Sequence, residues 1–169
     1  MEKSKFNELC DAYSNAQTNF ENFRLDCHSI ASTLVDELKK YMSIPEQRFS
    51  LYRINPQKEF QVVPPSLVNA LVLASDSYWH FGVGLTVCKH EEKSLQEELI
   101  LIHLMVRKES DGQFFVKYAN EDEEFEVFKD KPESFHSFFD FLHQAIIDSY
   151  KERLQQFLSE KTERKLGYV

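Results

Sequence analysis

Residues 98–108, Glu-Leu-Ile-Leu-Ile-His-Leu-Met-Val-Arg-Lys, decide the fold class of this chain. In an extended strand, successive side chains point to opposite faces of the sheet. Both faces of this segment are apolar: Leu99, Leu101 and Met105 on one, and Ile100, Ile102, Leu104 and Val106 on the other. Such a strand is typical of the centre of a sheet. We predict that it is covered on both sides, by helices on opposite faces or by a partner subunit on one of them.

The segments on either side of this strand have the composition and alternation of further strands. Residues 78–89 precede it, and residues 113–119 and 123–128 follow it after the turn signals Ser110-Asp111-Gly112 and Asn120-Glu121-Asp122. Residues 48–54 alternate in the same way, and a short strand is predicted at 60–63. Short connections of this kind join antiparallel strands. We therefore predict an α+β fold in a single domain over 1–169, with an antiparallel sheet of about five strands and a meander at 78–128.

Long amphipathic helices are predicted at both ends of the chain. Residues 4–43 place apolar side chains at steps of three and four, from Phe6 to Tyr41, which is the mark of one buried stripe. Residues 132–161 repeat this pattern behind Pro132, a residue suited to the first turn of a helix. A short helix is predicted near 65–74, after Pro64-Pro65.

The first helix is too long for the domain that it belongs to. A helix over 4–43 would be about 60 Å long, whereas a domain of this size is about 30 Å wide. Either the helix breaks near 14–19, a weak helix-forming segment, or its first half projects. A projecting half must bury its stripe on something, most simply on a second copy of itself. We therefore expect a homo-oligomer that forms through the first helix.

The composition narrows the class of partner. The formal net charge of −8 disfavours binding to nucleic acid and to anionic membrane surfaces, and it suits a partner protein, including a basic one. No apolar run approaches the length of a membrane span, and the first residues lack the apolar core of a signal peptide. Three cysteines, with no two at metal-ligand spacing, favour reduced thiols and a cytoplasmic location. No cofactor or metal site is predicted.

Two histidines in neighbouring strands are the candidates for catalysis. His103 interrupts an otherwise apolar strand, and a buried polar group there needs a partner. In a purely structural role, His103 is a hydrogen-bonded histidine of the core. In a catalytic role, it is a general base near His80 and Asp76, or near a hydroxyl such as that of Ser77. The register of the 78–89/98–108 hairpin decides whether both histidines share a face.

Several other residues are candidates for contact with a partner. Aromatic and arginine side chains are enriched at binding hot spots, which singles out Tyr52, Arg53 and Tyr78. The acidic run at Glu121, Asp122, Glu123 and Glu124 suggests a solvated turn or a docking site for a basic protein. Gly82 and Gly84 indicate a bulge or the close approach of a helix to the sheet.

Three functional hypotheses follow from these features. The favoured one is a non-enzymatic protein-binding module, an acidic adaptor, chaperone-like or immunity-type protein, acting as a homodimer. The second is a small hydrolase or nucleotide-handling enzyme, which requires His80 and His103 to point into one cavity with a carboxylate within reach. The third is a small-molecule sensor with an apolar pocket at the sheet, which requires a cavity beside Gly82 and Gly84.

Overall fold

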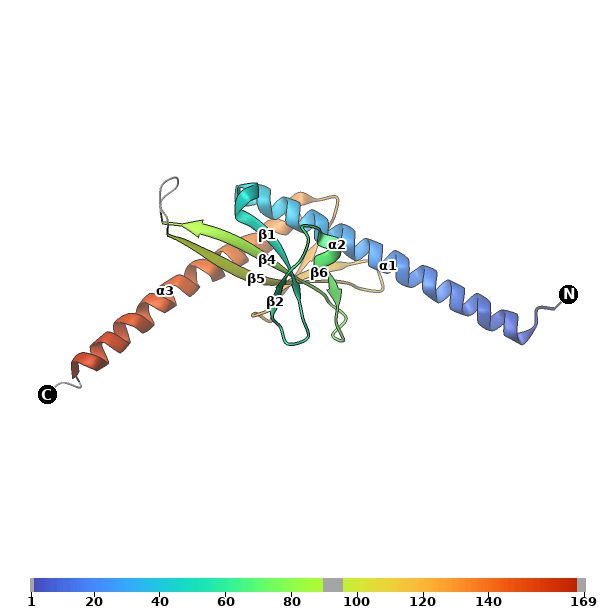
Figure 1. The fold of residues 1–169 in the computed structure, drawn as a ribbon. Helices are drawn as coiled ribbons and strands as arrows, with labels where there is room; N and C mark the ends of the chain where they lie inside the picture. The colour runs from blue at the N-terminus through green and yellow to red at the C-terminus, as the bar shows by residue number, and fades with distance from the viewer. Residues whose placement is uncertain (1, 90–95, 167–169) are drawn as a thin grey trace.

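A computed structural model describes residues 2–89 and 96–166 and confirms the α+β class. Its antiparallel sheet has seven strands, slightly more than predicted, in the order β2-β1-β4-β5-β6-β7, with β3 also paired to β4 (Figure 1). The strands are β1 (Phe49–Ile54), β2 (Phe60–Val62), β3 (Val72–Leu73), β4 (Trp79–Cys88), β5 (Glu97–Lys108), β6 (Phe114–Tyr118) and β7 (Glu124–Val127). The predicted 98–108 strand is therefore β5, at the centre of the sheet.

The helices are α1 (Lys5–Tyr41), α2 (Leu67–Ala70) and α3 (His136–Leu166), with short 3₁₀ turns at Glu46–Arg48 and Pro132–Phe135. Ser4 caps α1 by accepting a hydrogen bond from the Asn7 amide, and Lys39 and Lys40 lie in its last turn, where cations stabilise the helix dipole. The weak helix-forming residues at 14–19 do not interrupt α1. The first half of the helix instead extends beyond the sheet, the second of the two predicted outcomes (Figure 1).

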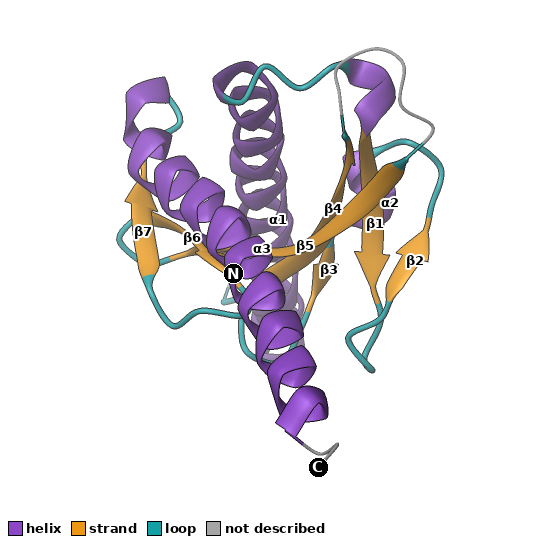
Figure 2. Cartoon of the chain, turned by 90° about the vertical axis from the view of Figure 1, so that its left-hand side faces the viewer, coloured by secondary structure: helices purple, strands orange, loops and turns teal. Residues whose placement is uncertain are grey.

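Both long helices pack on the same face of the sheet, so the predicted placement on opposite faces is wrong (Figure 2). One cluster of buried side chains joins Leu34 of α1 and Phe138 of α3 to Phe81 of β4 and Leu104 of β5. The other face carries glycines and polar residues on β4, which offer a helix little apolar surface to bury. Leu99 and Leu101 of β5 lie on that open face and remain 46% and 41% exposed.

The predicted helix near 65–74 is also wrong over most of its length. Only Leu67–Ala70 is helical, and the backbone turns extended at Leu71. Val72 and Leu73 then form β3, pairing with His80 and Trp79 of β4. Val72 and Leu73 are extended because they can complete a hairpin with β4. The hairpin supplies backbone hydrogen bonds that a single turn of helix does not.

Candidate functional site

Three titratable side chains form a hydrogen-bonded chain on the open face of the sheet. Nδ1 of His80 lies 2.7 Å from Nε2 of His103, and Nε2 of His80 lies 2.9 Å from Oδ2 of Asp76. The carboxylate of Asp76 accepts only, so it is Nε2 of His80 that donates toward it. Asp76 thus holds the His80 ring, and His80 in turn holds the His103 ring.

The strand register explains why these residues meet. His103 pairs with Gly82, and His80 lies two residues before Gly82 on the same strand and the same face. Asp76 lies in the turn between β3 and β4, where its carboxylate also accepts a hydrogen bond from the Tyr78 amide. The adjacent Ser77 has a positive φ of 68°, which closes this turn tightly. The two histidines therefore share one face, with a carboxylate within reach, as the hydrolase hypothesis requires.

His103 remains neutral over most of the physiological range. Burial is the main cause that lowers its pKa to about 4, and the charges of His80 and Lys58 lower it further, against the opposing effect of Asp76. The ring also packs edge-on against Phe60, with 6.4 Å between ring centroids. A neutral imidazole can accept a proton from a ligand, and a partner on its other nitrogen orients it.

A pocket of about 410 Å³ opens at this cluster. The turn after β1 and the β3–β4 hairpin form its walls, and Lys58, Asp76, His80 and His103 supply its charged and titratable groups. The rest of the lining is mostly apolar and comes from Ile54, Pro56, Val72, Leu73 and Ala74. A mostly apolar pocket with a few convergent polar groups is the usual form of a small-molecule site.

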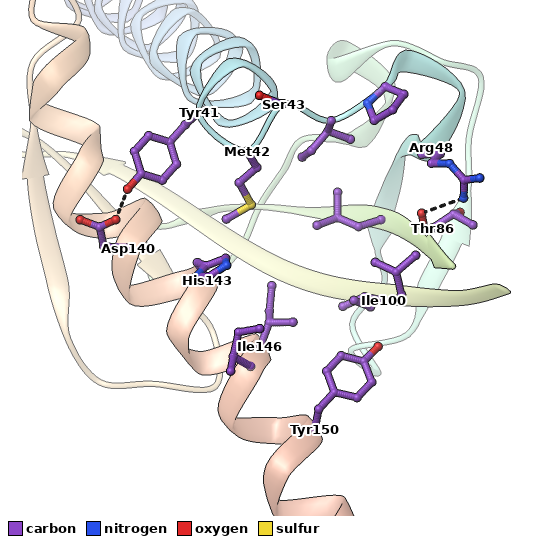
Figure 3. Close-up of a pocket in the computed structure, with 15 residues that line it drawn as sticks. Tyr41, Met42, Ser43, Arg48, Thr86, Ile100, Asp140, His143, Ile146 and Tyr150 are labelled. Atoms are coloured by element: carbon purple, nitrogen blue, oxygen red, sulfur yellow. Dashed lines mark hydrogen bonds between the residues drawn. The ribbon is translucent and has the colours of Figure 1, made fainter. Parts of the chain in front are cut away.

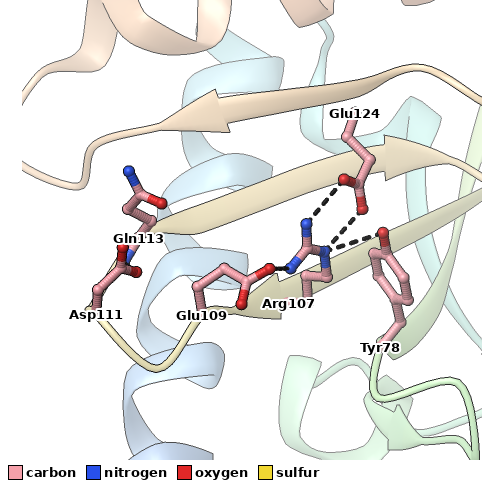
Figure 4. A network of polar contacts seen from close by, with 6 residues as sticks. All are labelled: Tyr78, Arg107, Glu109, Asp111, Gln113 and Glu124. Atoms are coloured by element: carbon pink, nitrogen blue, oxygen red, sulfur yellow. Dashed lines mark hydrogen bonds and ion pairs between the residues drawn. The ribbon is translucent and has the colours of Figure 1, made fainter.

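A second polar network is centred on Arg107, a residue for which the sequence predicted no role (Figure 4). Its guanidinium donates two parallel hydrogen bonds to Glu124, at 2.7 and 2.8 Å, and further hydrogen bonds to Glu109 and to the Tyr78 hydroxyl. Bidentate pairs of this kind are strong and geometrically specific. β6 lies between Arg107 on β5 and Glu124 on β7, so no local sequence pattern links the two residues.

The network includes two of the residues predicted to contact a partner protein. Tyr78 and Glu124 are already engaged with Arg107, so their polar groups are not available in the way that a docking site requires. Glu121, Asp122 and Glu123 remain exposed at the turn between β6 and β7.

Tyr52 and the two glycines form a separate contact on the open face. A Cβ on Gly82 would lie 2.6 Å from the Phe60 ring, and a Cβ on Gly84 would lie 2.6 Å from the Tyr52 ring. The close approach predicted at these glycines is therefore made by aromatic side chains of β1 and β2, and neither a helix nor a bulge is involved. This packing fills the space where the sensor hypothesis placed a cavity. Arg53 is exposed on β1.

An apolar pocket does lie on the opposite face, between the end of α1, the sheet and α3 (Figure 3). Its volume is about 760 Å³, and its walls include Met42, Leu85, Ile100, Ile146 and Tyr150. Arg48 stands at one side of it, where the guanidinium donates to the Thr86 carbonyl oxygen at 3.3 Å. Tyr41 donates a hydrogen bond to Asp140 at another side.

The first half of α1 carries an uncovered apolar stripe. Phe6, Leu9 and Tyr13 are 71%, 69% and 66% exposed, and Phe20 is 48% exposed. The same stripe becomes buried against the sheet only from Cys27 onward. The far end of α3 repeats this situation, with Leu154, Phe157 and Leu158 exposed.

Neither protein-family models nor curated proteins nor solved structures provide a match for this chain. Among the described residues, no group of three or more histidine, cysteine, aspartate or glutamate side chains is arranged to hold a metal ion. No helix within 2–89 and 96–166 is long and apolar enough to cross a membrane.

Proposed function

We propose that this protein is a protein-binding module that forms a homodimer by pairing the first halves of two α1 helices. The observation that supports the proposal is the exposed stripe of Phe6, Leu9, Tyr13 and Phe20. Large apolar side chains scattered singly on a surface are normal, but a contiguous row of them marks an interaction site.

The spacing of the stripe favours a helix as its partner. From Phe6 to Leu34 the apolar positions alternate steps of three and four without interruption, through Leu9, Tyr13, Ala16, Phe20, Phe23, Cys27 and Ile30. A repeat of 3.5 residues keeps such a row facing a second helix along its length, as in a coiled coil. On the C-terminal part of α1 this row faces the sheet, and on the first half it faces solvent.

A second copy complements the stripe when the helices run antiparallel. If the pair is centred between Ser14 and Asn15, Tyr13 lies opposite Ala16 of the second copy, a large side chain against a small one. Leu9 then lies opposite Phe20, and Phe6 lies opposite Phe23. Large-to-small alternation of this kind is a feature of well-packed helix pairs.

The chain exposes more surface than a compact monomer of its mass, and the excess is large enough to include a dimer interface. The accessible surface is 11923 Å², whereas a compact monomer of 20.0 kDa exposes about 8,700 Å². Stable protein–protein interfaces bury about 1,200–2,000 Å² in total. Complete burial of Phe6, Leu9 and Phe20 from two copies sets an upper bound of about 9–18 kcal/mol on their contribution, against about 4–15 kcal/mol for association. We therefore expect a reversible, concentration-dependent dimer.

Sedimentation equilibrium of two charge variants tests this proposal. Leu9→Glu places a carboxylate in the stripe, and Asn15→Glu places the same charge on the opposite side of the same exposed segment. We expect a dimer for the wild type and for Asn15→Glu, and a monomer for Leu9→Glu at all concentrations. A wild type that stays monomeric at millimolar concentration would show that the homodimer is wrong, as would equal weakening by both substitutions.

A small-molecule sensor is the second candidate, supported by the 760 Å³ apolar pocket between the long helices. Its size and apolar walls suit a ligand of drug-like dimensions. Filling the pocket with Ile146→Trp should abolish binding of the dye 8-anilinonaphthalene-1-sulfonate, and Val62→Ala, at an exposed position on β2, should leave it unchanged. If the wild type does not bind the dye, this candidate is excluded.

A further inference from the structure

We propose that the pocket at Asp76, His80 and His103 is a hydrolytic site for small, largely apolar esters, in which His103 acts as the general base. This inference goes beyond the binding function proposed above and does not depend on it. It rests on the hydrogen-bonded chain of 2.9 and 2.7 Å that links the three side chains, and on the pocket that the three residues line.

The chain of hydrogen bonds fixes which nitrogen of His103 is the base. With Nε2 of His80 donating to Asp76, the neutral His80 ring has its acceptor at Nδ1. That nitrogen lies 2.7 Å from Nε2 of His103, which therefore donates to it. The remaining nitrogen of a neutral His103 is then Nδ1, which carries a lone pair. Asp76 and His80 are positioning residues, because they act through the ring of His103.

The reaction balances with water as the only co-reactant. His103 Nδ1 takes a proton from water while the water oxygen bonds to the ester carbonyl carbon. The carbonyl electron pair moves onto oxygen, and the ammonium of Lys58, which lines the same pocket, neutralises this oxyanion. When the tetrahedral intermediate collapses, the carbon–oxygen bond to the alcohol breaks, and the alcohol oxygen takes the proton back from His103. The products are a carboxylic acid and an alcohol.

The environment of His103 keeps its ring free to accept a proton before the reaction begins. Below pH 6 an ordinary imidazole is mostly protonated and cannot act as a base. The pKa of His103, which is lowered to about 4 with burial as the first cause, keeps the ring unprotonated there. The positive charge that forms on His103 during the reaction is shared through His80 with the carboxylate of Asp76. The apolar walls formed by Ile54, Val72 and Leu73 suit an acyl or aryl group.

Hydrolysis of p-nitrophenyl butyrate by the full-length protein tests the proposal. His103→Gln should lower kcat/KM by about a hundredfold or more, the lower end of the effect expected for loss of a general base. His136→Gln is the matched control, since His136 is an exposed histidine outside the pocket, and its rate should stay within about twofold of the wild type. The Leu9→Glu variant should retain full activity, so failure of the dimer and failure of this site are distinguishable.

The pH profile distinguishes a positioning role from a purely structural one. Wild-type kcat/KM should persist to near pH 4, where His103 becomes protonated. Asp76 raises the pKa of His103, so Asp76→Asn should move the acid limb of the profile to lower pH and reduce the rate. Lys58 lowers that pKa, so Lys58→Gln should move the acid limb to higher pH. Loss of folding would shift neither limb in this opposed manner.

The inference is overturned by any of three results. The first is a wild-type rate no greater than that of His103→Gln. The second is an equal loss in His103→Gln and His136→Gln, which would assign the activity to exposed histidines. The third is an acid limb that stays near pH 6.5, the ordinary value for histidine, in the wild type and in both charge variants. Melting curves of each variant accompany the rates, so that a folding defect is recognised.

Discussion

At the scale of single residues, His103 links the stability of the protein to pH. Its folded pKa of about 4 lies below the ordinary value, so between these values the unfolded chain binds a proton that the folded chain does not. The stability that this residue confers is therefore present above about pH 6.5, declines as the pH falls toward 4, and changes no further below that.

The comparison of the wild type with His103→Gln isolates this effect. Between pH 7.5 and pH 4.5, the wild type should lose on the order of 2–3 kcal/mol more unfolding free energy than the variant, because the variant has no imidazole at this position. Urea unfolding at a series of pH values measures the difference. Parallel stability curves for the two proteins would show that burial does not depress the pKa of His103 as described.

The residues of the candidate site could be predicted from the sequence only in part. His80, His103 and Asp76 were candidates because a histidine inside an apolar strand needs a partner. The contact between His80 and His103 depends on the β4–β5 register, because a slip of one residue would place the two histidines on opposite faces of the sheet. Lys58 and Arg107 gave no such signal, because a single basic residue in a turn or strand is most often a solvated one.

At the scale of elements, the pairing of β1, β2 and β4 depends on the glycines of the open face. Gly82→Ala should destabilise the fold by about 1–3 kcal/mol, because the new methyl group would meet both the Phe60 ring and the Cβ of Tyr52, which cannot rotate away. Gly84→Ala should cost less, since Ser50 Oγ and the edge of the Tyr52 ring can move aside. Thermal unfolding of the two variants tests this order. An equal or reversed order would contradict it.

The elements themselves were largely predictable, because their signals are periodic. The two long helices follow from repeats of three to four residues, and the strand at 78–89 follows from a repeat of two. The strand at 98–108 follows from a short run that is apolar on both faces. The sequence predicts a helix at Val72 and Leu73, because two apolar residues are too few to show the two-residue repeat of a strand. Only their pairing with β4 makes them a strand. The side of the sheet on which each helix packs was likewise not encoded in any one segment.

At the scale of the whole molecule, the two long helices give the chain an extended outline. The first half of α1 and the far half of α3 leave the sheet in different directions (Figure 1). A compact chain of this length has a radius of gyration of about 15 Å. Small-angle scattering of the Leu9→Glu variant, which keeps the chain monomeric under the proposal above, should give a clearly larger value. A radius near that of a sphere would show that the projecting helices fold back in solution.

The projection of α1 also affects how tightly a dimer would bind a surface that displays several copies of its target. Antiparallel pairing would place two sheets at the ends of one shared rod, each with its own open face and its own ester pocket. A scaffold that displays two targets at the matching spacing would then engage both at once, and the second attachment would be intramolecular. Such bivalent binding prolongs the residence time on the scaffold far beyond that of a single subunit, although neither subunit makes a new contact.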